Sequence, residues 1–109
     1  MTGDTGAVEI ALHTRLRPGA EEAYERIHAV IPADLDAALR EAGVLSWRIW
    51  RDGLDLFHLV RVVDPVQMRR HLRDHPANQV WQQRMAALLD VPDTYDDGAT
   101  GLGLVWKLP

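Results

Sequence analysis

The feature that most constrains the fold is Ala20–Asp34, AEEAYERIHAVIPAD, because it joins an amphipathic helix pattern to a proline. Ala23, Ile27 and Val30 recur at three-to-four-residue spacing, which predicts one apolar helix face. Pro32 lacks the amide N–H that a helix interior requires, and its ring crowds the carbonyl four residues earlier. The pattern therefore predicts either one kinked helix or two helices in succession.

Tyr24 and His28 bring a phenol and an imidazole together just before this interruption. Residues four apart lie on the same helix face, one turn from each other. Imidazole has an ordinary pKa near 6.5, so His28 can give or take a proton at neutral pH. We expect this pair to form the catalytic site; the alternative is that His28 only hydrogen-bonds a backbone carbonyl.

The composition describes an ordinary globular chain and excludes several classes of protein. The chain has 109 residues, of which 26% are charged, and a net charge of −4. Its basic residues are scattered, which argues against nucleic acid as a partner. Without cysteine it forms no disulfide, zinc–thiolate site or cysteine nucleophile. No apolar run approaches the roughly 18 residues of a membrane span, and no signal sequence is apparent, so we expect a cytoplasmic protein without a membrane partner.

The predicted elements follow in the order strand, helix, strand, strand, helix, strand. Residues 1–7 are small and polar and predict a disordered tail, followed by a single domain over residues 8–109. Asp64-Pro65 provides an N-cap and a proline at the first helical position. The predicted strands cover residues 8–14, 44–50, 56–63 and 102–108, and the helices cover residues 20–42, from 65 to His75-Pro76, and 78–89.

This order is that of a ferredoxin-like β-α-β-β-α-β domain, an α+β fold with a four-stranded antiparallel sheet and its helices on one face. The other face is left bare, and a second copy of the chain is its simplest cover, so we expect a homodimer. On the strand Val44–Trp50, alternation places Leu45 and Trp47 on one face and Trp50 on the other.

Tryptophan is unusually frequent, with four Trp beside two Tyr and one Phe. Flat indole faces pack on the C–H faces of sugars and keep an N–H donor. The alternative is that at least two of the four are core or dimer-interface residues. We expect that placement for Trp106, which shares its side of the predicted strand with Leu104 and Leu108.

Three further histidines are less informative. His71 and His75 are four residues apart, a spacing that can hold a metal, but no acidic ligand lies between them as in HExxH. We expect them to be surface residues and expect no metal site. His58 shares the parity of Leu56 and Val60 on its strand, so it is either buried or lines a cavity.

These segments together resemble the rhamnose mutarotase family of dimeric α/β-barrel proteins. The matching stretches are AEEAYERIH, SWRIWRD, LFHLVRV, NQVWQQRM and LVWKLP, and they span about Ala11 to Pro109. The resemblance implies an isomerase that interconverts the α and β anomers of a 6-deoxy-hexose such as L-rhamnose, without cofactor or metal.

The resemblance also implies roles for individual residues. His28 is the catalytic acid/base with Tyr24 beside it, and Trp47, Trp50 and Trp81 hold the monosaccharide.

The chain departs from the family pattern at pocket positions. After the histidine the family often has Asn-Pro and Trp-Pro pairs, whereas this chain has Ala-Val-Ile-Pro, and Gln82 stands where some members have tryptophan. Two alternatives therefore stay open: a non-catalytic ligand-binding dimer, and a cofactor-free monooxygenase on the same barrel. Polar groups around His28 favour a sugar, and an apolar cavity favours the monooxygenase.

Overall fold

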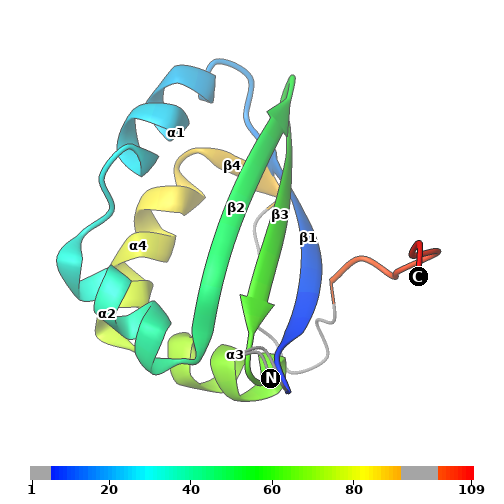
Figure 1. Cartoon of the computed structure of the whole chain (residues 1–109). Coiled ribbons are helices and arrows are strands. Elements are labelled where there is room, and N and C mark those ends of the chain that lie inside the picture. Colours follow the sequence, from blue (N-terminus) through cyan, green and yellow to red (C-terminus); the bar gives the residue numbers. More distant parts are fainter. Residues whose placement is uncertain (1–5, 92–100) are drawn as a thin grey trace.

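The computed structural model describes residues 6–91 and 101–109, which form a four-stranded sheet with four helices on one face (Figure 1). The elements are β1 (Val8–Leu16), α1 (Glu21–His28), α2 (Ala33–Glu41), β2 (Val44–Asp52), β3 (Asp55–Val62), α3 (Pro65–Arg73), α4 (Pro76–Ala86) and β4 (Leu89–Val91). The strand order is β2-β3-β1-β4, and every neighbouring pair is antiparallel. This arrangement confirms the predicted ferredoxin-like fold. None of the helices in the described ranges is long and apolar enough to span a bilayer.

Pro32 separates two helices instead of kinking one. The α1 helix ends at His28, and Pro32 is the N-cap of α2 with φ −58° and ψ 143°. The residue before a proline is biased away from the helical region, which favours this break. Val30 falls in the connection and is 85% exposed, so its predicted place on the apolar helix face is wrong.

Side-chain N-caps mark the starts of α3 and α4. The Asp64 carboxylate accepts hydrogen bonds from the backbone N–H groups of Val66 and Gln67, as its predicted N-cap role requires. His75 caps α4, because its Nδ1 accepts the N–H of Ala77 at 3.1 Å. The turn between α3 and α4 therefore contains a histidine whose ring is hydrogen-bonded to the first turn of α4.

The fourth strand is not the predicted one. It is formed by β4, which pairs with Arg15 and Leu16 of β1, whereas the expected strand over residues 102–108 is absent and that segment has no regular secondary structure. The helix predicted to reach Leu89 ends at Ala86. Alternation in LGLVWKL is typical of a strand but does not specify which strand it would pair with.

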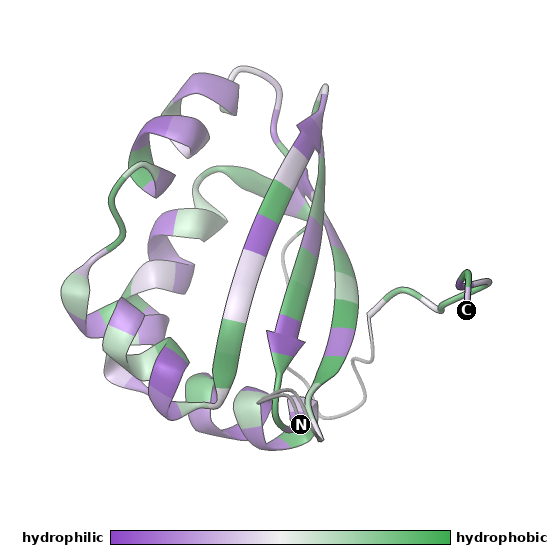
Figure 2. Ribbon diagram, in the orientation of Figure 1, coloured by the Kyte–Doolittle hydropathy of each residue, from purple (hydrophilic) through white to green (hydrophobic). Residues whose placement is uncertain are grey.

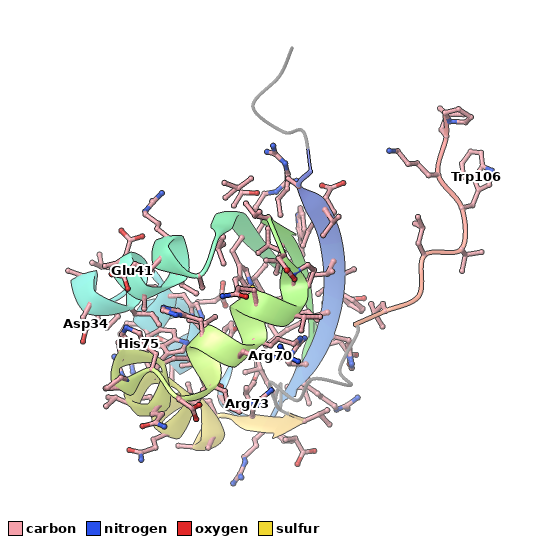
Figure 3. The ribbon with its side chains drawn as sticks, turned by 90° about the horizontal axis from the view of Figure 1, so that it is seen from below. Asp34, Glu41, Arg70, Arg73, His75 and Trp106 are labelled. Carbon is pink, nitrogen blue, oxygen red and sulfur yellow. The ribbon has the colours of Figure 1, made fainter. Side chains whose placement is uncertain are left out.

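The C-terminal segment leaves the body beside β1 (Figure 1). The N–H of Leu102 donates to the carbonyl of Ala11 at 2.6 Å. Beyond it, Trp106 lies away from the helices (Figure 3) and is 71% exposed. Its predicted place in the core is therefore wrong for the single chain, and its place at an interface stays a prediction. The disordered tail predicted for residues 1–7 lies outside the described residues over positions 1–5.

The core lies between the sheet and the helices and has two parts. One gathers around Val60, Val62, Met68 and Leu72, and the other around Leu16, Tyr24, Leu35, Leu56 and Trp81. A shift in the β2–β3 pairing between Val44 and Ser46 turns Val44 inward and leaves Leu45 46% exposed. The alternation that grouped Leu45 with Trp47 on one face is interrupted by this bulge at the start of β2.

Hydrophobic and hydrophilic residues alternate along the strands (Figure 2). The face of the sheet away from the helices carries large aromatic side chains. His13, Phe57 and Trp50 form one row across β1, β3 and β2. Phe57 and Trp50 are 42% and 51% exposed. Asp55 accepts a 2.8 Å hydrogen bond from His13 Nε2 beside this row. No other element of the described chain covers this face (Figure 1).

Candidate active site

A cavity of about 340 Å³ lies between the inner face of the sheet and helices α1, α2 and α4. This volume is within the range of small-molecule sites. Its apolar lining comes mainly from α2 and the neighbouring strands. The lining residues with polar side-chain atoms are Thr14, Tyr24, His28, Trp47, His58, Asn78, Trp81 and Gln82.

His28 is the last residue of α1 and its side chain faces this cavity. Its Nδ1 lies 2.9 Å from the carbonyl oxygen of Tyr24, one helical turn earlier. A carbonyl can only accept, so Nδ1 carries the hydrogen and donates it. In the neutral ring this leaves the lone pair on Nε2, the nitrogen available to a ligand. The backbone bond that the sequence offered as an alternative role is therefore present, and it orients the imidazole.

Burial shifts the pKa values of His28 and Tyr24 in the directions that keep both side chains neutral. It lowers the pKa of His28 below its ordinary value, and the positive charge of Arg84 adds to this lowering; the hydrogen bond to the Tyr24 carbonyl acts in the opposite direction. Burial raises the pKa of Tyr24 well above its ordinary value. At neutral pH the site thus holds a neutral imidazole, which can act as a base, and a neutral phenol.

Two aromatic rings pack against the imidazole of His28. The Tyr24 ring lies 4.1 Å from it between centroids, and Trp81 of α4 meets it edge-on at 5.0 Å. The guanidinium of Arg84 lies over the Trp81 ring at 5.3 Å. Trp81 is only 8% exposed, so α4 places a buried ring beside His28.

A second polar group in the cavity is a hydrogen-bonded chain from β1 to β2. The indole N–H of Trp47 donates to Nδ1 of His58 at 3.1 Å, and Nε2 of His58 lies 2.9 Å from Oγ1 of Thr14. Indole is only a donor, so Nδ1 accepts and the neutral His58 ring donates from Nε2. The hydroxyl hydrogen of Thr14 then remains available to donate to another acceptor. These contacts place a fixed polar patch on the sheet side of the cavity.

Asn78 forms a third polar contact of the wall and is 2% exposed. Its amide donates to the carbonyl of Leu72 at 3.0 Å, which ties α4 to the end of α3. Gln82 donates to the side-chain oxygen of Asn78 at 3.3 Å. The side-chain amides of Asn78 and Gln82 on α4 therefore line the same cavity as the hydrogen-bonded chain on the sheet.

The structure brings four of the five predicted site residues to one cavity: Tyr24, His28, Trp47 and Trp81. Trp50 is not among them, because it lies on the outer face of the sheet, in the row with Phe57. This follows from the opposite parity of Trp47 and Trp50. The catalytic and binding roles of these residues stay predictions.

The sequence did not assign roles to Thr14, His58 and Asn78 in this site. The parity of His58 predicted that it is buried or lines a cavity, and the structure confirms both. Thr14 has the same strand parity as the buried Leu12, and this parity was the sequence signal that Thr14 points inward. No signal in the sequence marked Asn78.

Replacing Trp47 with phenylalanine should lower the free energy of unfolding by about 1–3 kcal/mol, because Nδ1 of His58 loses this donor in a buried position. Urea denaturation measures the change. Val80→Ala is the control, since Val80 is 59% exposed on α4 and an exposed substitution changes stability by about 0.5 kcal/mol or less. Equal stability of the two variants would show that the Trp47–His58 bond contributes nothing.

Comparison with known proteins places this arrangement in a family. Residues 9–108 match the family model described as L-rhamnose mutarotase. An L-rhamnose mutarotase of Verminephrobacter eiseniae is 32% identical over 105 residues, which cover 93% of this chain and 91% of that protein.

Solved structures share the fold at lower identity. The L-rhamnose mutarotase of Formosa agariphila matches with a TM-score of 0.74 and 21% identity, covering 94% of this chain and 99% of that one. The protein Rv0793 of Mycobacterium tuberculosis matches with a TM-score of 0.51 and 22% identity, covering 79% and 86%. The extent of the family match and of the Verminephrobacter relative shows that the chain belongs to the L-rhamnose mutarotase family.

Proposed function

We propose that the chain is a cytoplasmic aldose mutarotase, an isomerase that interconverts the α and β anomers of L-rhamnose or a related deoxy-hexose. The observation that carries this proposal is His28, an imidazole held by the Tyr24 carbonyl with its other nitrogen available in a mainly apolar cavity that carries a few polar groups. Membership of the L-rhamnose mutarotase family supports the substrate class.

The reaction requires two proton transfers and no redox step. His28 Nε2 takes the proton of the anomeric hydroxyl, the bond between C1 and the ring oxygen breaks, and the protonated imidazole returns the proton, through a water molecule, to the ring oxygen. The aldehyde at C1 rotates, the same steps run in reverse, and the ring closes on the other face. A positioned histidine is the usual group for such transfers near neutral pH. The chemistry needs no cofactor.

Tyr24 supports this reaction as a neutral hydroxyl. Its raised pKa excludes phenolate as a base at neutral pH, so it acts by hydrogen bonding to the sugar or to a water at the ring oxygen. The carrier of the proton is therefore His28, with Tyr24 as its neighbour.

The lining of the cavity favours a sugar over the alternatives. Trp47 and Trp81 offer flat apolar surfaces, while Thr14, Asn78 and Gln82 offer hydrogen-bonding groups around them. A bulky apolar substrate, as a monooxygenase of this barrel type would require, offers no hydrogen-bond partner to Nε2 of His28 or to the hydroxyl hydrogen of Thr14.

The decisive experiment is NMR exchange spectroscopy between the anomers of L-rhamnose, with L-fucose and D-glucose as comparisons, each with and without the protein. Faster exchange of L-rhamnose supports the proposal. If no sugar exchanges faster, the mutarotase proposal fails, and titration of L-rhamnose against tryptophan fluorescence tests the ligand-binding alternative.

We infer that two chains pair through the sheet face that carries His13, Phe57 and Trp50. Exposed rings on a bare sheet face favour an apolar partner, and a second copy brings the same row. The exposed apolar side chains of the C-terminal segment add to this surface; they are Leu104, Val105, Trp106 and Leu108.

Sedimentation at micromolar concentration should therefore give a homodimer, and Phe57→Glu should shift it toward the monomer, because it buries a charge in the interface. Val80→Glu is the matched control, since Val80 is 59% exposed on α4, away from this face. A wild-type species of 12.3 kDa would overturn the inference.

A further inference from the structure

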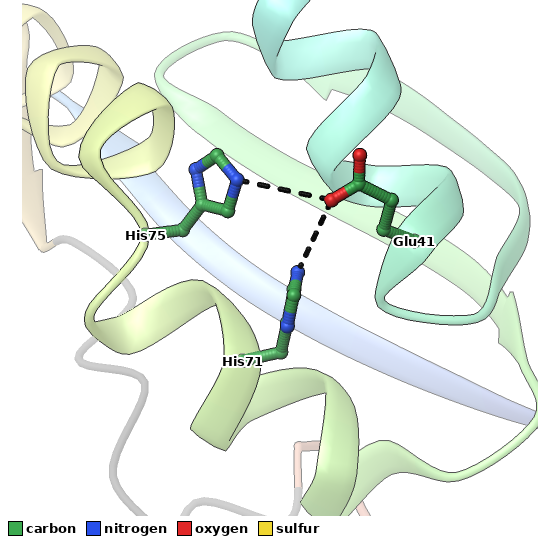
Figure 4. Close-up of side chains that lie close together, drawn as sticks. All are labelled: Glu41, His71 and His75. Carbon is green, nitrogen blue, oxygen red and sulfur yellow. Dashed lines mark ion pairs between the residues drawn. The ribbon is translucent and has the colours of Figure 1, made fainter.

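Three side chains of the types that bind metal ions lie close together outside the cavity (Figure 4). Glu41 ends α2, His71 belongs to α3, and His75 caps α4. Figure 3 shows Glu41 and His75 on neighbouring helices. Oε2 of Glu41 lies 3.7 Å from Nε2 of His71 and 4.0 Å from Nε2 of His75. None of the three lines the cavity at His28.

We propose that Glu41, His71 and His75 form a binding site for a divalent transition-metal ion, with Zn²⁺ as the best-matched ion. Two imidazole nitrogens and one carboxylate oxygen are a common zinc ligand set, and water completes the tetrahedron. Imidazole favours zinc and neighbouring transition metals over Mg²⁺ and Ca²⁺, which prefer oxygen ligands.

The spacing of the ligand atoms is close to that of a bound ion. The candidate ligand atoms all lie within 4.8 Å of one another. Zinc bonds of about 2.0–2.1 Å in a tetrahedron hold neighbouring ligand atoms roughly 3.4 Å apart. The two measured distances to Glu41 exceed this by only a few tenths of an ångström. The Glu41 side chain is 60% exposed, so rotation can bring its carboxylate closer to the two imidazoles.

A second observation points to a ligand at the same place. Nε2 of His71 is buried and has no hydrogen-bond partner, since its 3.7 Å distance to Glu41 exceeds a hydrogen bond. Buried polar atoms are nearly always satisfied, and an unsatisfied one calls for a partner such as an ion. A metal ion between Glu41 and His71 provides it.

His75 is the weaker of the two imidazole ligands, because it also caps α4. In the neutral ring its Nδ1 accepts from Ala77, so the ring proton lies on Nε2, facing Glu41. Coordination through Nε2 moves this proton to Nδ1 and breaks the bond to Ala77. We therefore expect removal of His71 to reduce affinity more than removal of His75.

Calorimetric titration of the full chain with Zn²⁺ alone, at pH 7.5 in a buffer that does not bind metal, tests the site. We expect one ion per chain, a rise in the melting temperature with Zn²⁺, and no effect of Mg²⁺. His71→Ala and Glu41→Gln should each weaken binding at least about tenfold, since even outer-shell changes cost about 10–100-fold.

Two further variants separate ligand loss from other effects. His75→Asn removes the ligand but keeps an N-cap residue, so α4 keeps its start while affinity falls. His13→Gln removes a histidine from the sheet face and should leave the titration unchanged. Failure to bind Zn²⁺ below about 1 mM, or unchanged binding in both His71→Ala and Glu41→Gln, overturns the proposal. Because Glu41 is exposed, Glu41→Gln keeps the test valid if His71→Ala unfolds.

Discussion

Replacing His28 with alanine is expected to slow the protein-catalysed exchange of L-rhamnose anomers by about 10²–10⁴-fold, the usual contribution of a positioned acid/base. His28 Nε2 is the group that carries the proton in the proposed reaction, and a raised pKa excludes Tyr24 as a substitute base at neutral pH. Exchange rates at saturating L-rhamnose, measured by NMR, give the change in turnover.

The control for this prediction must separate lost chemistry from lost structure. His28 packs against Tyr24 and Trp81, so alanine also removes contacts. His28→Gln keeps a side chain of similar reach but cannot carry a proton, and it should show the same loss. His13→Gln removes a histidine outside the cavity and should exchange anomers at the wild-type rate. Wild-type rates in folded His28→Ala would remove His28 from the mechanism.

The pH dependence of the wild type provides a second readout of the same residue. Because burial lowers the pKa of His28 in the folded protein, the neutral base persists below pH 6.5, and exchange should decline only as pH falls through that lowered pKa. Between these two pKa values the unfolded chain binds more protons than the folded one, so stability also decreases as pH falls. A decline centred above pH 6.5 contradicts the assignment.

The fold followed from patterns that operate over short distances. Alternation along β1 and β3 and the Asp64 cap both predicted elements that the structure contains. The errors arose where pairing partners decide the outcome. The segment 102–108 alternates like a strand, yet it pairs with no strand of the described chain, and a bulge at the start of β2 interrupts the alternation that grouped Leu45 with Trp47.

The site likewise combines residues that local spacing predicts with residues that only strand pairing brings together. Tyr24 and His28 could be predicted because helical spacing alone places them together. The bond between Thr14 and His58 joins residues 44 apart, so it depends on the register between β1 and β3. Register is set by the whole sheet, and no local pattern in either strand specifies it.

The cluster proposed to bind zinc depends on the packing of helices in the same way. His71 and His75 have a recognisable spacing, but their acidic partner, Glu41, comes from α2 and reaches them only because the helices pack side by side. Sequence spacing alone therefore favoured surface histidines, whereas the structure supplies the third ligand.

Replacing Trp81 with alanine should lower the free energy of unfolding by about 3–5 kcal/mol, the usual cost of removing a buried tryptophan. Trp81 is 8% exposed, belongs to the core cluster of Leu16 and Leu56, and holds the imidazole of His28 edge-on. Urea denaturation followed by far-UV circular dichroism measures the loss without relying on the indole signal.

The matched variant Trp81→Phe distinguishes the packing role of this ring from its proposed contact with the sugar. Phenylalanine keeps an aromatic ring in the core, so this variant should retain most of the stability that alanine loses. It presents a smaller face to the cavity and moves the edge that meets His28. If Trp81 forms a wall of the sugar site, KM for L-rhamnose should rise in folded Trp81→Phe; if Trp81 also positions the imidazole, turnover should fall as well. Unchanged KM and turnover in this variant would restrict Trp81 to the core and leave Trp47 as the aromatic wall.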